Sequence, residues 1–110
     1  MINTSLTALA RQHLEKASTA SSGRSAHSVI GGHNHLLHQT MIALIAGQKL
    51  DDHANTGNAT VQVIHGRVRL DSGGESWEGA TGHLIEVPDA IHSVTALEDA
   101  VILLTAVNRP

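Results

Sequence analysis

Short apolar segments separated by glycine-containing turns occupy most of the chain after residue 26. Residues 38–46 are aliphatic almost throughout, which is typical of a strand that is covered on both faces. Residues 67–70 and 83–87 instead alternate between polar and apolar side chains, as half-exposed strands do. We predict strands at 27–30, 38–46, 61–64, 67–70, 76–78, 83–87, 92–97 and 100–107. The pattern therefore predicts a mostly β protein.

The beginning of the chain has a different pattern. Apolar residues recur at helical spacing over residues 4–17, and Thr4 or Ser5 can cap the first turn. We therefore predict one helix, whose apolar stripe must pack on the β domain or on a second subunit. His13 lies beside this stripe and is predicted to be a residue at the edge of the helix. Residues 18–26, STASSGRSA, have the composition of a linker.

Composition limits the size and the kind of protein. The 110 residues are enough for one domain, and its core must be aliphatic because the chain has one Trp and no Phe or Tyr. The formal net charge of −3, without a basic patch, argues against a nucleic-acid partner. No apolar run reaches the length of a membrane span, and no signal-peptide pattern is evident. Cysteine is absent, which excludes disulfides and thiolate metal sites, and we expect a cytoplasmic protein.

Nine histidines are unusual in so short a chain. Three of them, His33, His35 and His38, follow a Gly-Gly turn, and two imidazoles spaced as H-x-H on a strand can bind a metal ion. The spacing lacks the glutamate and the further histidine that would make a metal site specific. A polar surface loop is therefore the favoured interpretation of this segment, and a metal site is the alternative.

The segment from Gly47 to Gly66, GQKLDDHANTGNATVQVIHG, carries the main motif of the chain. It resembles the first motif of the cupin superfamily, G-x5-H-x-H-x3,4-E-x6-G. The two glycines and His53 match in register, whereas Asn55 stands at the second histidine and Ala59 at the glutamate. Since residues two apart on an extended chain share a face, we expect His53 and Asn55 to point into the same space.

A second match lies downstream. The second cupin motif reads G-x5-P-x-G-x2-H-x3-N, and Gly82, Pro88 and His92 stand for its glycine, proline and histidine. Ala90 replaces the inner glycine, His92 comes one residue early, and Ala96 stands where the asparagine is expected. The two half-motifs occur in the cupin order in a chain of suitable length, so together they are more specific than either alone.

The resemblance covers about residues 38–107 and implies a small double-stranded β-helix, which is a form of jelly-roll barrel. We therefore divide the chain into an N-terminal helix and linker, residues 1–26, and a cupin barrel, residues 27–110. The fold leaves the chemistry open, because barrels of this kind have many functions.

The resemblance also implies where a site lies. In metal-binding cupins, two histidines and the glutamate of the first motif join the histidine of the second motif to hold Fe, Mn, Ni or Zn. Carried over to this sequence, only His53 and His92 remain, and two imidazoles fall short of the three protein ligands of a catalytic zinc site. A third ligand would have to come from elsewhere. The candidates are Asp51, Asp52, Gln62, His35 and His38.

Without a metal ion, His53, Asn55 and His92 still give a barrel cavity a polar mouth, as in many small-molecule sites. The favoured hypothesis is a small cupin that binds a small ligand near these three residues. The alternative is a metal-dependent cupin enzyme of the dioxygenase or isomerase type with an atypical ligand set. A third hypothesis is an interaction module, and we expect a homodimer under all three. Whether the protein is an enzyme stays open at this point.

Overall fold

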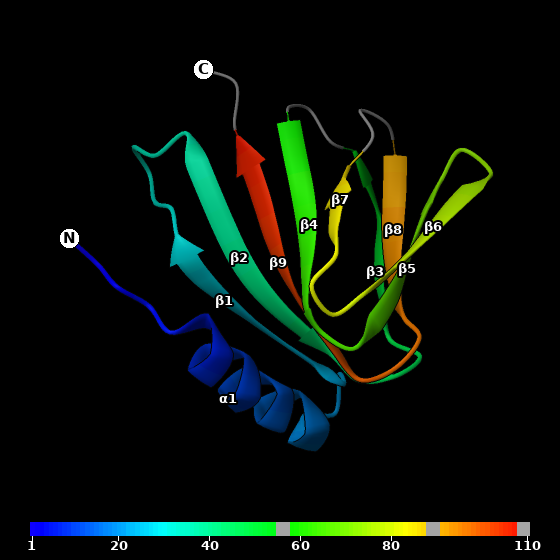
Figure 1. Ribbon diagram of the computed structural model, residues 1–110, viewed down its shortest axis with the longest axis horizontal. Coiled ribbons are helices and arrows are strands. Elements are labelled where there is room, and N and C mark those ends of the chain that lie inside the picture. The colour runs from blue at the N-terminus through cyan, green and yellow to red at the C-terminus, as the bar shows by residue number, and fades with distance from the viewer. Residues whose placement is uncertain (55–57, 88–90, 108–110) are drawn as a thin grey trace.

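The computed structural model describes residues 1–54, 58–87 and 91–107, with the backbone alone for residues 52–54 and 91. Two β-sheets face each other, and one helix lies against the outside of the larger sheet (Figure 1). The elements are α1 (Leu6–Thr19), β1 (Arg24–Ile30), β2 (Leu37–Leu44), β3 (Lys49–Ala54), β4 (Asn58–His65), β5 (Arg67–Ser72), β6 (Glu75–Ala80), β7 (Leu84–Glu86), β8 (Ile91–Ala96) and β9 (Ala100–Val107).

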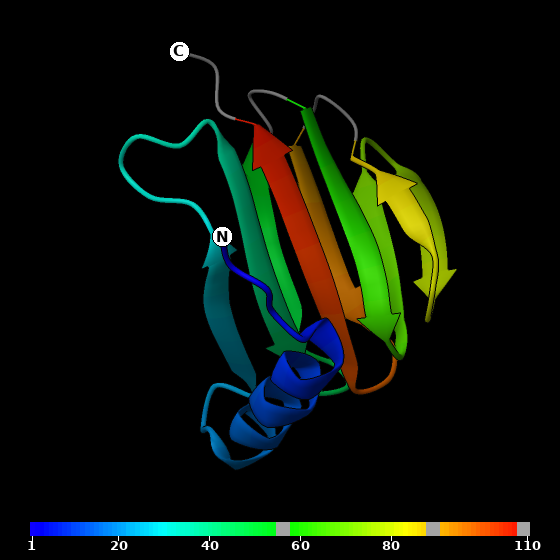
Figure 2. The ribbon, with the colours of Figure 1, turned by 60° about the vertical axis from the view of Figure 1, so that its left-hand side comes forward.

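The strand order identifies the architecture. The larger sheet has the order β1-β2-β9-β4-β7, and the smaller has the order β3-β8-β5-β6. The strands pair antiparallel, and β9 lies between β2 and β4 (Figure 2). Consecutive strands alternate between the two sheets at several points, as a jelly roll requires. The predicted mostly β barrel with one N-terminal helix is confirmed.

The space between the sheets is filled by aliphatic side chains. Leu44, Val63, Val68 and Leu70 are fully buried there, and Ile102 from β9 is 1% exposed. The alternation predicted for residues 67–70 is also confirmed, because Val68 and Leu70 face this core while Arg67 is exposed. Burying a Val, Leu or Ile side chain stabilises a fold by about 1.5–3 kcal/mol. The core therefore reaches adequate size without Phe or Tyr.

Helix α1 covers the outer face of the larger sheet. Ser5 caps it, because the Ser5 side chain accepts a hydrogen bond of 3.2 Å from the Ala8 amide. Its buried Ala10 and Ala17 pack with residues of the outer face, among them Met41 of β2. Alternate residues of β2 thus face the helix and the barrel core, which confirms the prediction of a strand covered on both sides. In the described part of the chain, no helix is long and apolar enough to span a membrane.

The linker predicted for residues 18–26 is wrong at both ends. Helix α1 continues to Thr19, and β1 begins at Arg24, which pairs with Leu44 of β2. Gly23, with a φ of 67°, makes the turn between the two elements. The polar composition of this segment does not indicate a strand, because β1 is an edge strand whose side chains are mostly exposed. The division of the chain at residue 26 stays a prediction.

His13 also differs from its prediction as a helix-edge residue. Its side chain is 5% exposed, its Nδ1 shares a hydrogen bond of 2.6 Å with Oγ of Ser25, and its ring centroid lies 5.1 Å from that of His27. Burial, followed by the charges of Lys16 and His27, lowers the pKa of His13. The helical pattern could not show this, because the partner of His13 comes from β1.

Candidate functional site

The residues of the two cupin-like motifs meet at one end of the barrel, where β3 ends and β4 and β8 begin (top of Figure 1). His53 is the penultimate residue of β3, Ala59 is the second residue of β4, and His92 is the second residue of β8. In the smaller sheet, β3 and β8 are neighbours, and His53 pairs directly with His92. The two motifs therefore contribute a cross-strand histidine pair.

His92 faces the interior of the barrel. Its side chain is 3% exposed, and it shares a face of β8 with Val94 and Ala96, which belong to the barrel core. A neutral imidazole has one donor and one acceptor nitrogen, so a buried histidine here places both functions next to an apolar space. This is an environment in which a histidine can orient a ligand or exchange a proton with it.

A β-bulge sets the position of His53. Leu50 pairs with Val94 and His53 pairs with His92. Three residue positions along β3 therefore correspond to two along β8. Leu50 packs against the barrel core, and simple alternation from Leu50 would place His53 on the opposite face. The extra residue in β3 instead sets the backbone of His53 opposite that of His92. Bulges are frequent beside active sites and binding sites because they redirect side chains.

Ala59 occupies the glutamate position of the motif. It is 8% exposed, belongs to the barrel core and pairs with Ala106 of β9. Its methyl group supplies no ligand atom, and its buried position leaves that part of the wall apolar. Asn55, the other departure from the motif, lies outside the described residues.

The described side chains among the five candidates for a third metal ligand do not form a metal-binding group with His92. Gln62, Asp51 and His35 are exposed, and the side chain of Asp52 lies outside the described part. His38 is on the barrel face beside Ala106, but its Nε2 lies 2.9 Å from the carbonyl oxygen of His35. Within the described residues, no group of three His, Cys, Asp or Glu side chains is placed to hold a metal ion.

The glycines of the motifs have a clear structural role. Gly47, Gly66 and Gly82 all have a φ between 87° and 90°, which only glycine adopts readily. At Gly66 a Cβ atom would also lie 2.2 Å from the carbonyl oxygen of Asp99. The matched glycines therefore explain the fold part of the resemblance, independently of any chemistry at the site.

Trp77 lies on the same face of the smaller sheet as part of the barrel core. It pairs with Leu70, which pairs with Val94, so these three share the interior face of the smaller sheet. The indole is nevertheless 39% exposed. The sequence contains the information that places Trp77 on this face, because a two-residue turn at Gly73 and Gly74 pairs Leu70 with Trp77.

A separate polar cluster lies on the exposed side of the smaller sheet. Asp71 accepts hydrogen bonds from Oγ of Ser76 and, at 3.0 Å, from Nε of Arg69. The Ser76 hydroxyl and the Arg69 guanidinium lower the pKa of the Asp71 carboxyl, in that order. Both oxygens of the carboxylate have partners within the hairpin, so the cluster stabilises the β5–β6 turn rather than offering an open site.

No protein-family model matches the chain, and no curated protein matches it in sequence. Solved structures do match. A conserved protein of unknown function from Streptococcus pyogenes has a TM-score of 0.73 at 24% identity, over 83% of this chain and 79% of that chain. A cupin superfamily protein from Desulfitobacterium hafniense has a TM-score of 0.71 at 9% identity, over 78% of both chains.

KdgF from Halomonas is also similar, with a TM-score of 0.66 at 20% identity over 78% of this chain and 80% of that chain. At such identities the comparisons establish the fold and not the activity. The strand order, the three turn glycines and these neighbours agree with one another. The chain therefore has the fold of a small cupin barrel.

Proposed function

We propose that this protein binds a small molecule at the end of the barrel where β3 ends and β8 begins, in contact with His53, Asn55 and His92. The observation that carries the proposal is the buried imidazole of His92, which faces the barrel interior and belongs to a residue paired directly with His53. A buried polar group costs free energy unless it has partners. His92 has such interactions within the protein, and a bound ligand would add to them. A mainly apolar wall with a few convergent polar groups is the common form of a small-molecule site.

Trp77 adds to this proposal. It is the single aromatic residue of the Phe, Tyr and Trp types in the chain, and it shares the interior face of the smaller sheet with His92. A partly exposed indole on that face offers an apolar surface for a planar or aliphatic ligand. We infer that polar groups of the ligand face the histidines and that its apolar part lies toward Trp77.

A metal-dependent cupin enzyme is the second candidate, and the direct pairing of His53 with His92 favours it. The described residues do not complete the ligand set, because Ala59 stands at the position of the carboxylate and no group of three His, Cys, Asp or Glu side chains is found among them. Two imidazoles hold a transition metal more weakly than the three or four ligands of a catalytic centre. We therefore derive no reaction step through a metal ion for this chain.

Elemental analysis separates the two candidates. Untagged wild-type protein and a His53→Ala, His92→Ala double variant are purified in parallel and analysed for Fe, Mn, Ni and Zn, before and after reconstitution. A His33→Ala variant serves as the control, because His33 lies in an exposed loop. Near-stoichiometric metal in the wild type and the control, and none in the double variant, would establish the metal-dependent candidate instead of a metal-free ligand site.

Ligand binding is tested directly with a screen of small metabolites. Fluorescence of Trp77 is the readout, since no other tryptophan contributes. We expect at least one compound class to change the emission with saturation, and to bind about tenfold more weakly to His92→Ala than to His33→Ala, as loss of one buried hydrogen bond predicts. Equal binding by both variants would contradict a site at His92.

A further inference from the structure

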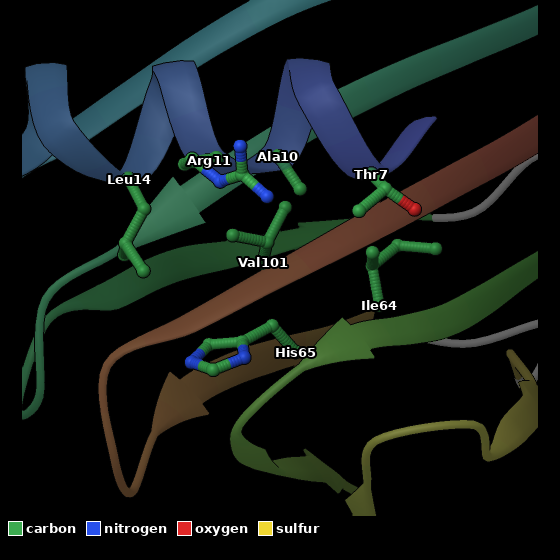
Figure 3. A pocket seen from close by; sticks show the side chains of 7 residues that line it. All are labelled: Thr7, Ala10, Arg11, Leu14, Ile64, His65 and Val101. Atoms are coloured by element: carbon green, nitrogen blue, oxygen red, sulfur yellow. The ribbon is translucent and has the colours of Figure 1, made fainter. Parts of the chain in front are cut away.

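A groove lies between α1 and the outer face of the larger sheet, away from the barrel interior (Figure 3). Its volume is about 290 Å³. One wall is the helix and the other is formed by the end of β4, while Val101 of β9 lies between them. No local pattern in the sequence indicates this groove, because its two walls are more than forty residues apart along the chain.

The base of the groove is apolar. Ala10 of the helix is 6% exposed and Val101 is fully buried, and both belong to the cluster that joins the helix to the sheet. Leu14 and Ile64 are partly buried against the same cluster and line the sides. The short side chain of Ala10 is what leaves the space open, since most larger residues at this position would fill it.

Two nitrogen-bearing side chains stand at the rim. Arg11 comes from the helix and His65 from the last position of β4, on the two sides of Val101 (Figure 3). Both residues are exposed. Among the residues that the structure describes, Arg11 and His65 have no hydrogen-bond or ion-pair partner for their side chains. The ion pairs among the described residues are formed by Arg67 and Arg69. A guanidinium thus stands beside an apolar groove without a carboxylate to neutralise it.

We propose that this groove binds a small organic carboxylate with an apolar body. The planar guanidinium of Arg11 matches a carboxylate with two parallel N–H donors, and the His65 ring supplies one N–H donor even when it is neutral. The hydrocarbon part of the ligand lies on Ala10, Ile64 and Val101, which gives an organic acid an advantage over an inorganic anion. A volume of about 290 Å³ is at the lower end for ligand pockets, so the ligand is small.

The groove is independent of the site in the barrel. It lies on the helix side of the larger sheet, whereas His92 faces the core between the two sheets. The two sites are separated by the fully buried side chains of the larger sheet, so a ligand in one does not contact residues of the other. An experiment that contradicts the site in the groove therefore does not contradict the site at His92, and the reverse also holds.

The test is a titration followed by amide chemical shifts of the isotope-labelled full chain, in a buffer without phosphate. The probes are benzoate and hexanoate, and the uncharged controls are benzamide and hexanamide. We expect saturable shifts at the amides of Ala10, Ile64 and Val101 with both carboxylates. Binding by the two amides should be weaker by about tenfold, because they lack the charge that Arg11 recognises.

Variants then assign the charge. Arg11→Gln should weaken benzoate binding by about tenfold, and His65→Gln should weaken it by a smaller factor. Lys16→Gln is the matched control, because it removes the same charge from the same helix at a residue that does not line the groove. We expect it to bind benzoate as the wild type does.

Three results would overturn the proposal. One is the absence of any shift with either carboxylate in the folded wild type. Another is equal binding by benzoate and benzamide, or by Arg11→Gln and Lys16→Gln, which would show that charge plays no part. The third is a set of shifts confined to His92, Val94 and their neighbours, which would place the acids in the barrel.

Discussion

Restoring the missing carboxylate at the motif position tests whether the end of this barrel can still form a metal site. The change is Ala59→Glu, with Ala59→Gln as the matched control of nearly the same size. Ala59 is 8% exposed and packs in the barrel core, at the same end as the pair His53 and His92. A carboxylate placed there would offer the two imidazoles a third ligand, which the described residues do not supply.

The expected effects follow from the burial of Ala59. Overpacking costs about 1–3 kcal/mol in both variants. The buried amide of the glutamine adds about 1–3 kcal/mol, and an unpartnered charge on the glutamate adds about 3–5 kcal/mol, so the totals are about 2–6 kcal/mol for Ala59→Gln and about 4–8 kcal/mol for Ala59→Glu. Both values are within the total stability of a typical domain, so both variants should fold at low temperature. A metal ion at a free concentration of about 100 times its Kd then stabilises the folded state by about 2.7 kcal/mol. For a domain of this size that raises Tm by about 10 °C.

The assay is thermal unfolding with and without Zn²⁺ or Ni²⁺, combined with metal analysis after gel filtration. We expect Ala59→Glu to melt lowest without metal and to gain the most with it. The wild type and Ala59→Gln should gain little, and adding His92→Ala to Ala59→Glu should abolish the gain. The reasoning is refuted if metal raises the Tm of Ala59→Glu no more than that of Ala59→Gln, or if the gain survives without His92.

Three further predictions concern stability. Gly66→Ala should lower the free energy of unfolding by about 2–5 kcal/mol in urea titrations, because its φ is 87° and its Cβ would meet the Asp99 carbonyl. Gly74→Ala, at a φ of 83° in open space, should cost only about 1–2 kcal/mol, and similar losses would contradict the steric argument. Because the pKa of His13 is lowered in the folded protein, the unfolded chain takes up a proton first as pH falls below 6.5. The free energy of unfolding should therefore decrease from pH 6.5 downward and level off below the folded pKa. If a His13→Gln variant showed the same change of stability with pH between pH 7 and 5, His13 would be excluded as its source. Deleting residues 1–20 should expose the outer face of the larger sheet and cause aggregation or loss of the expected dimer, whereas an unchanged oligomer in light scattering would show that the helix is dispensable.

Much of the fold was predictable from the sequence. The aliphatic run of β2, the alternation in β5 and the turn glycines are local signals, and each acts in the structure as the pattern indicates. Glycine at Gly66 is required by backbone geometry, which is why a motif can identify the fold even where its metal ligands have changed. The start of β1 was missed because an exposed edge strand has no hydrophobic pattern to reveal it.

The site was less predictable, because it depends on register. The bulge between Leu50 and His53 changes the register of β3, and no sequence pattern shows where such an extra residue falls. The motif, and not the periodicity, is the basis for naming His53 as a candidate. The buried contact of His13 with Ser25, and the groove beside Arg11, depend on where the helix lies on the sheet. No local pattern contains that information.

The place of β9 has a consequence for synthesis of the protein. This strand is the last of the nine strands to leave the ribosome, yet it lies in the middle of the larger sheet and pairs with both β2 and β4. Until residues 100–107 emerge, both neighbours have an open edge, and nascent chains with open edges are prone to aggregate. The barrel therefore closes only after residues 100–107 have emerged, and fragments that stop before residue 100 should be substrates for chaperones and proteases instead of folded proteins.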